Sequence, residues 1–153
     1  RPPRSTLFPY TTLFRSPGSQ SRVPVTGLDL FPTLAELAGY AKPLPKSLDG
    51  GSLTRLLRNQ GQGAVQRSNS FLLFHQAVAR TAQTALIHGD YKLVKTWRGN
   101  RLELFDLSKS VEEDINLAEK LPDKTEKLHR LMTGYLDNVG AETRKITTKK
   151  ANQ

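Results

Sequence analysis

The sequence predicts an α+β fold in which a small antiparallel sheet is covered by a long helix near the C-terminus. Residues 84–107 contain three short runs rich in aromatic and β-branched side chains, and turn-forming residues separate these runs. Residues 122–139 then place apolar side chains at helical spacing. With 153 residues, 37% of them hydrophobic, the chain has room for one ordinary domain of this kind.

The predicted strands cover residues 85–87, 91–97 and 101–107. The tripeptides His-Gly-Asp and Arg-Gly-Asn separate them, and glycine or asparagine there can adopt positive φ. Strand alternation assigns one face of the middle strand to Tyr91, Leu93, Lys95 and Trp97. An antiparallel meander with one covered face is therefore expected.

The helix over residues 122–139 is the most strongly patterned element of the chain. Its apolar stripe consists of Leu128, Leu131, Met132, Tyr135, Leu136 and Val139. Asp123 and Glu126 have the spacing of a capping box, and Gly140 suits the left-handed residue that ends a helix. We expect the stripe to pack on the sheet and His129, between core positions, to be exposed.

Shorter elements are predicted ahead of the sheet. An extended segment near Pro24 leads to a helix over residues 29–38, which Asp29 can cap and Gly39 can end. The apolar stripe of this amphipathic helix consists of Leu30, Leu34, Leu37 and Ala38.

A second short helix is predicted over residues 52–58. Residues 59–69 are polar and glycine-containing, which is typical of a linker between subdomains. Residues 70–76 form an apolar run whose length suits a buried strand.

The net charge of +9 is concentrated at the chain ends. Residues 1–16 and 141–153 carry +3 each, which leaves +3 for residues 17–140. This distribution favours basic tails on a nearly balanced body over a nucleic-acid-binding surface.

The run of acids at residues 112–114 indicates a solvated face and not a cation site. No cysteine is present, which excludes disulfides and thiolate metal ligands, and no run of about 18 apolar residues predicts a transmembrane helix.

Residues 1–16, RPPRSTLFPYTTLFRS, resemble the in-frame translation of a common sequencing-library adapter. We expect this segment to be non-native and disordered, with the authentic polypeptide entering at about Pro17. The alternative interpretation is an amphipathic strand over residues 7–14.

Four segments carry a family resemblance. Residues 23–40 contain Asp-x-x-Pro-Thr, and residues 47–53 read SLDGGSL. Residues 85–95 read ALIHGDYKLVK, and residues 103–118 read ELFDLSKSVEEDINLA. In this order they resemble the C-terminal part of a sulfatase, one of the sulfuric ester hydrolases of the alkaline phosphatase superfamily. Val111 stands where a proline is usual in that family, which cautions against carrying over fine specificity.

The resemblance implies a two-part enzyme. A large N-terminal α/β domain would hold a divalent cation, usually calcium, and a formylglycine matured within a Cys/Ser-x-Pro-x-Arg motif. A smaller subdomain would hold a four-stranded antiparallel sheet with a long terminal helix. Residues 17–69 would then be the end of the catalytic domain, including a strand, short helices and a linker. Residues 70–140 would be the C-terminal subdomain, and residues 141–153 a basic, disordered tail.

None of the nine prolines has the flanking residues of the formylglycine motif, so the nucleophile and the metal site are expected upstream and the fragment is expected to be inactive. His75, at the end of the first C-terminal strand, is the substrate-binding candidate, and Arg80 and Lys92 are further candidates for sulfate contact. For His75 the alternative is a packed or hydrogen-bonded structural histidine.

The resemblance implies a parent enzyme that cleaves sulfate esters of carbohydrates or aryl compounds, periplasmic or secreted if bacterial. Its expected partners are the sulfated substrate and the N-terminal catalytic domain, with no membrane. One alternative is a small basic nucleic-acid-binding module that stacks bases on Trp97, Tyr91 and Phe105. Another is a fragment of a related phosphodiester or phosphonate hydrolase.

Overall fold

A computed structural model describes residues 20–77 and 82–143. The adapter-like segment, Arg80 and the end of the basic tail lie outside these ranges. The chain divides into two compact units, with the boundary between Asn69 and Ser70.

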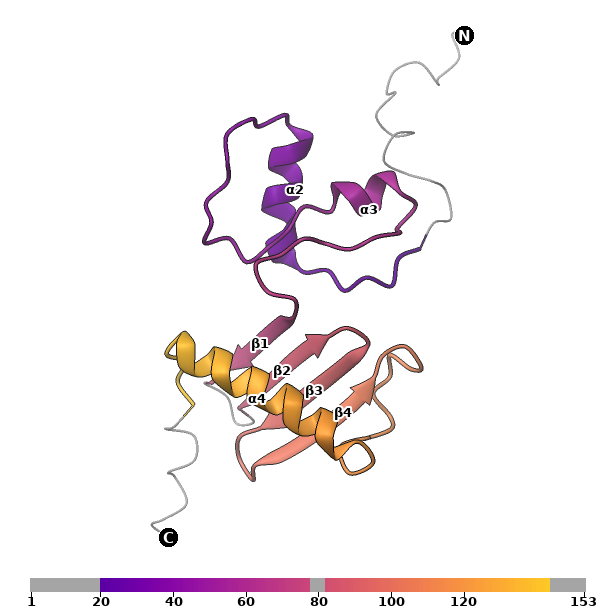
Figure 1. Cartoon of the computed structure of the whole chain (residues 1–153), viewed down its shortest axis with the longest axis vertical. Coiled ribbons are helices and arrows are strands. Elements are labelled where there is room, and N and C mark those ends of the chain that lie inside the picture. The colour runs from indigo at the N-terminus through magenta and orange to yellow at the C-terminus, as the bar shows by residue number, and fades with distance from the viewer. Residues whose placement is uncertain (1–19, 78–81, 144–153) are drawn as a thin grey trace. The chain divides into compact units, whose positions relative to one another are not determined.

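The C-terminal unit is a four-stranded antiparallel sheet in the order β1-β2-β3-β4, crossed by one long helix (Figure 1). The strands are β1 (Leu72–Gln76), β2 (Gln83–His88), β3 (Tyr91–Thr96) and β4 (Arg101–Asp106), and the helix is α4 (Pro122–Asn138). The sheet and the covering helix confirm the predicted α+β class.

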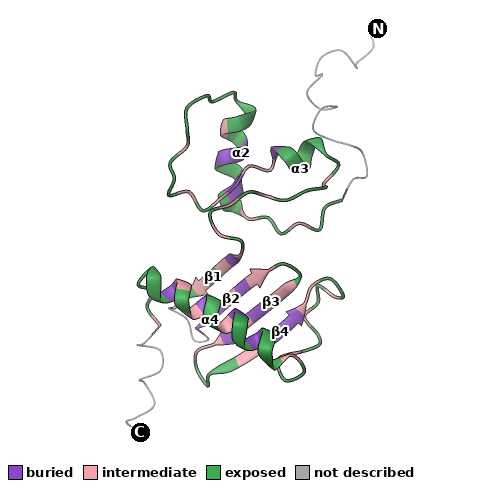
Figure 2. Cartoon of the chain, viewed as in Figure 1, coloured by how far each residue is buried: buried purple, intermediate pink, exposed green. Residues whose placement is uncertain are grey.

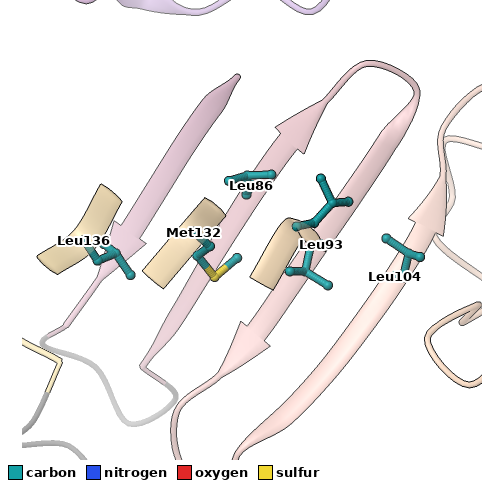
Figure 3. Close-up of a cluster of buried hydrophobic side chains, with 6 residues drawn as sticks. Leu86, Leu93, Leu104, Met132 and Leu136 are labelled. Atoms are coloured by element: carbon teal, nitrogen blue, oxygen red, sulfur yellow. The ribbon is translucent and has the colours of Figure 1, made fainter. Parts of the chain in front are cut away.

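The core lies between α4 and one face of the sheet. The register places Leu86, Leu93 and Leu104 opposite one another on neighbouring strands, and each is 0% exposed. Leu128, Met132 and Leu136 cover them from α4 (Figure 3). The alternation along β3 therefore buries Leu93 as its spacing predicts. The stripe of α4 is buried only in part, because Leu131 and Val139 are 36% and 53% exposed.

Both hairpin turns use the left-handed backbone. Gly89 (φ 58°) lies between β2 and β3, and Gly99 (φ 90°) and Asn100 (φ 51°) lie between β3 and β4. Glycine and asparagine are the residues that adopt this conformation at least cost, so the turn clusters of the sequence mark the hairpins correctly.

The ends of α4 differ in how well the sequence predicts them. Gly140 follows the helix with φ 63°, as expected of a left-handed cap. At the other end the expected capping box is wrong, because the helix begins at Pro122 and has no side-chain cap bond. Instead, the Thr125 hydroxyl donates to the carbonyl oxygens of Ala118 and Leu121.

The N-terminal unit holds η2 (Gly27–Asp29), α2 (Leu30–Leu37) and α3 (Thr54–Arg58). The backbone is extended at Thr26, with φ −139° and ψ 162°. Among the described residues no strand precedes β1, so the segment near Pro24 is extended without a ladder partner. An extended segment becomes a strand only when its backbone groups pair with a neighbour.

Helix α2 turns its leucine stripe outward. Its buried residues are Pro32 and Thr33, whereas Leu30, Leu34 and Leu37 are 55%, 63% and 39% exposed (Figure 2). An inward stripe, as the amphipathic pattern predicts, is therefore wrong for the described residues. Within residues 20–77 and 82–143, no helix combines the length and apolarity needed to cross a membrane.

Candidate functional site

The Asp29 side chain accepts four hydrogen bonds from other described residues of the N-terminal unit, and it is 0% exposed. Its carboxylate accepts hydrogen bonds from the Thr26 amide (2.8 Å) and the Gly51 amide (2.9 Å). Arg67 donates to both of its oxygens, from Nε at 2.9 Å and from Nη2 at 2.7 Å. Burial alone raises the pKa of Asp29, but the bonds from Arg67, Gly51 and Thr26 hold it below the ordinary 3.8.

The loop opposite Asp29 requires glycine at two successive positions. A Cβ on Gly50 would lie 2.0 Å from the Leu28 carbonyl oxygen, and one on Gly51 would lie 2.1 Å from the Gln66 carbonyl oxygen. Only a residue without Cβ allows this approach of backbones. The SLDGGSL segment thus brings an amide to Asp29.

Thr33 makes a second connection to the same loop. Its hydroxyl donates to the Asp29 carbonyl oxygen (2.5 Å) and accepts from the Leu53 amide (2.9 Å). With Pro32 buried beside it, each specified position of the Asp-x-x-Pro-Thr segment has a packing or bonding role. This segment therefore holds the N-terminal unit together.

A hollow of about 430 Å³ lies beside this ion pair, between α2 and the loops. Several of its polar groups are bonded within the N-terminal unit. Arg67 is bound to Asp29, the Ser68 hydroxyl donates to the Leu48 carbonyl oxygen, and hydrogen bonds from Ser52 and Thr54 lower the pKa of Glu36. These groups are therefore already engaged within the unit, and Tyr40, Lys46 and Gln66 are the other polar residues of the lining that carry long side chains.

A second hollow, also of about 430 Å³, lies on the C-terminal unit. Lys92, Val94 and Phe105 line it from the face of the sheet opposite α4, and Phe74 at the edge strand is 49% exposed. The full lining comprises Phe74, His75, Gln76, Gln83, Ala85, Lys92, Val94, Glu103, Phe105 and Glu113. It combines aromatic surface, amides and charged groups.

Lys92 lies on this open face, where its ammonium forms an ion pair with Glu113. Glu113 belongs to the acidic run after β4, so one member of that run is paired with a lysine. Among the described residues that line the open-face hollow, Lys92 is the one lysine or arginine.

The His75 side chain belongs to the opposite, α4-facing side of the sheet, since β-strand register pairs it with Thr84. Its Nδ1 lies 2.7 Å from the Thr84 hydroxyl, which accepts a bond from the Trp97 indole N–H at 2.8 Å. The hydroxyl proton is then free for Nδ1, which favours the tautomer protonated on Nε2. That Nε2 is buried and has no hydrogen-bond partner among the described residues.

The predicted site residues do not form one cluster. His75 and Lys92 both belong to the lining of the second hollow, but their side chains lie on opposite faces of the sheet. Arg80 lies outside the described residues. His75 has the packed, hydrogen-bonded surroundings of the structural alternative. Substrate contact by these residues stays a prediction.

The described residues do not fit a calcium site. In residues 20–77 and 82–143, no group of three His, Asp or Glu side chains lies close enough together to hold a metal ion. Calcium takes six to eight oxygen ligands, which the single carboxylate of Glu113 beside Lys92 does not supply.

The aromatic residues proposed for base stacking do not form an exposed platform. Trp97 and Tyr91 pack against the core beneath α4. Phe105 lies on the other face and is only 8% exposed. This arrangement counts against the nucleic-acid-binding alternative, which needs stacking surfaces open to solvent.

A polar cluster that the sequence analysis missed lies between the sheet and α4. Lys95, on the core face of β3, is 5% exposed, and its Nζ lies 2.9 Å from His129 Nε2 and 3.0 Å from Asn100 Oδ1. The expectation that His129 is exposed is wrong, because α4 turns it partly toward this lysine. The alternation that places Lys95 among apolar residues is a sequence signal for a buried cation.

Comparisons with known proteins agree on one family. No family model matches the chain. Arylsulfatase K of Xenopus laevis is 30% identical over 130 residues, which is 80% of this chain and 24% of that protein. Among solved structures, a Bacteroides thetaiotaomicron protein described as a sulfatase has 27% identity and a TM-score of 0.59 over 76% of this chain and 25% of its own. A 2-O GAG sulfatase has 29% identity and a TM-score of 0.53 over 72% and 24%.

The chain thus spans about a quarter of the length of the curated relatives it matches. The 130-residue match is longer than either compact unit, so it extends across both. Both units therefore follow one another in the relative as they do here. Over this matched region the chain is homologous to the sulfatases.

Proposed function

We propose that this chain is the C-terminal portion of a sulfatase that hydrolyses sulfate esters of carbohydrates or aryl compounds. The observation that carries the proposal is the 30% identity to an arylsulfatase through both compact units. The similarity to a 2-O GAG sulfatase favours a sulfated carbohydrate. A periplasmic or secreted location for a bacterial parent belongs to the proposal and rests on the resemblance alone.

In this proposal the formylglycine nucleophile and the calcium ion belong to an upstream catalytic domain. The chain has no cysteine, and none of its prolines is flanked as the formylglycine motif requires. A formylglycine supplies a nucleophile, and a cation offsets charge on the sulfate oxygens. The present chain would shape the rim of the pocket.

The open face of the sheet is the part of the chain we assign to that rim. The ammonium group of Lys92 and the half-exposed ring of Phe74 line the same hollow, which suits a ligand with an anionic group and an apolar face. The ammonium group of Lys92 is paired with Glu113. When a sulfate binds, Lys92 would replace this charge-assisted hydrogen bond with one to the sulfate. His75 and Arg80 stay candidates from the sequence.

The exposed apolar surface of the N-terminal unit supports a larger parent. Leu28, Leu30, Phe31 and Leu34 are each more than half exposed, within one short stretch of η2 and α2. Contiguous apolar surface of this kind usually marks an interface. We propose that the upstream catalytic domain covers it.

A chromogenic aryl sulfate provides the activity test. Purified chain, assayed with and without calcium, should give no turnover above buffer, because the nucleophile and the metal ligands lie elsewhere in the parent. A sulfatase of known activity serves as the positive control for substrate and buffer. Calcium-dependent turnover by this chain would overturn the assignment of the chemistry to an upstream domain.

A further inference from the structure

Lys95 places a positive charge inside the contact between β3 and α4. The side chain lies on the same face of the sheet as the fully buried Leu93, and burial lowers the pKa of Lys95. Its Nζ also lies 5.0 Å from the centre of the Trp97 ring. Both hydrogen-bond partners of Nζ, the His129 ring and the Asn100 amide, are groups without charge when His129 is neutral. Burial of this cation therefore depends on acceptors rather than on an opposing charge.

The hydrogen bond between Lys95 and His129 determines where the protons of the two side chains lie. An ammonium has only donors, so His129 Nε2 must accept, and the imidazole proton must be on Nδ1. If His129 takes up a proton, Nε2 becomes a donor and two cations face each other across 2.9 Å. The pair therefore binds a second proton less readily than two separated groups would.

Charged groups reach His129 from both elements that meet there. Lys95 faces it from β3, and Glu126 faces it from α4, where Arg130 binds the Glu126 carboxylate at 2.7 Å. Burial and the charge of Lys95 lower the pKa of His129 below the ordinary 6.5, and the attraction of Glu126 offsets only part of this effect.

We propose that Lys95 and His129 form a pH-sensitive clamp, which holds α4 on the sheet at neutral pH and weakens when His129 becomes protonated. The sign follows from proton binding. Between the lowered folded-state pKa of His129 and the ordinary 6.5, the unfolded chain binds more protons than the folded chain. Stability from the clamp is thus complete above about pH 6.5 and is lost as the pH falls through the folded-state pKa.

Trp97 is the only tryptophan of the chain and lies next to the clamp, so its fluorescence reports the unfolding of the C-terminal unit. We would measure urea unfolding of the full chain from about pH 7.5 to about pH 5. The unfolding constant of the wild type should rise as the pH falls, by about tenfold for each unit of pKa depression. His129→Gln retains an acceptor for Lys95 without titrating, and its unfolding constant should rise less.

His88→Gln is the matched control, because it removes a histidine from the end of β2 and leaves the clamp intact. It should keep the pH dependence of the wild type. An equal pH dependence in wild type and His129→Gln, or its loss in His88→Gln, would overturn the proposal.

Proton NMR of the wild type provides a second measurement that needs no variant. The imidazole of His129 should titrate with a midpoint below 6.5. A midpoint at or above that value would overturn the clamp. In Lys95→Met, which removes the facing charge, the midpoint should move back up; an unmoved midpoint in a folded variant would also count against it.

Discussion

Asp29 and Arg67 lie 38 residues apart in the sequence and form a bidentate ion pair, with side chains that are 0% and 11% exposed. The same carboxylate holds the amides of Thr26 and Gly51, and Arg67 Nη2 also donates to the Pro24 carbonyl oxygen at 2.9 Å. One acid thus connects η2, the glycine loop and the end of the unit. Because every partner of Asp29 is a donor, the N-terminal unit needs this residue ionised.

The first prediction concerns Asp29→Asn, which leaves the Arg67 guanidinium buried without its counter-charge. Removing one partner of a buried pair costs about 3 to 5 kcal/mol, enough to unfold a small unit. Loss of amide protection from hydrogen exchange at Gly51 and Thr26 would report it. Glu103→Gln, in the exposed pair with Arg101, should cost less than about 1 kcal/mol. Retained protection in Asp29→Asn would contradict the assignment.

The N-terminal unit is also expected to lose stability as the pH falls, as the clamp does, but for a different reason. In the N-terminal unit the hydrogen bonds favour the charged form of Asp29, whereas in the clamp burial and Lys95 disfavour the charged form of His129. The folded-state pKa of Asp29 lies below 3.8. Its contribution is therefore complete above that value and is lost as the pH falls toward the folded-state pKa. For His129 the corresponding upper bound is its ordinary pKa of 6.5, below which burial and the charge of Lys95 hold the folded-state pKa.

At the scale of elements, α4 provides half of the C-terminal core. Met132 is 0% exposed and contacts the sheet leucines, whereas Leu131, the preceding residue, is 36% exposed. Neighbouring positions on a helix point about 100° apart, so one faces the sheet and the other solvent.

Met132→Ala should lower the free energy of unfolding of the C-terminal unit by about 2 to 5 kcal/mol, because it leaves a cavity between α4 and the sheet. Urea unfolding followed by Trp97 fluorescence measures the change. Leu131→Ala, on the same helix, should cost about 1 kcal/mol or less. Equal losses for the two variants would contradict the packing of α4 described above.

Local periodicity predicts the C-terminal unit well. The alternation of Tyr91, Leu93, Lys95 and Trp97 and the stripe of α4 depend on geometry within one element, and the sequence contains that geometry. Contacts between elements that are distant in the sequence are not predicted by local periodicity. The bond of His129 to Lys95 spans 34 residues, and neither local spacing nor composition signals it. The same limit applies to the Asp29 pair.

Helix α2 shows the same limit for a helix face. Its amphipathic pattern is correct, yet the pattern does not say which partner covers the apolar stripe. In the described residues Thr33 faces the glycine loop through its hydrogen bonds, and this orientation turns Leu30 and Leu34 outward. Predicting that outcome requires knowledge of the whole protein.

At the scale of the whole molecule, the two units differ in how complete they are. The C-terminal unit has its own leucine-rich core, whereas the N-terminal unit exposes most of its large apolar side chains. The match spans both units of this chain but only 24% of an arylsulfatase. The rest of such a protein could cover the exposed apolar side chains of the N-terminal unit. We infer that α2 packs on the upstream catalytic domain of the parent.

The most direct test of this account is the DNA sequence upstream of the codon for Pro17 in the source genome. A sulfatase parent predicts an open reading frame continuous with Pro17 that encodes a Cys/Ser-x-Pro-x-Arg motif and acidic metal ligands. It also predicts a protein about three and a half times as long as this chain, since a match of 130 residues covers 24% of its relative. A continuous frame of that length without the motif and the acidic ligands would contradict the assignment.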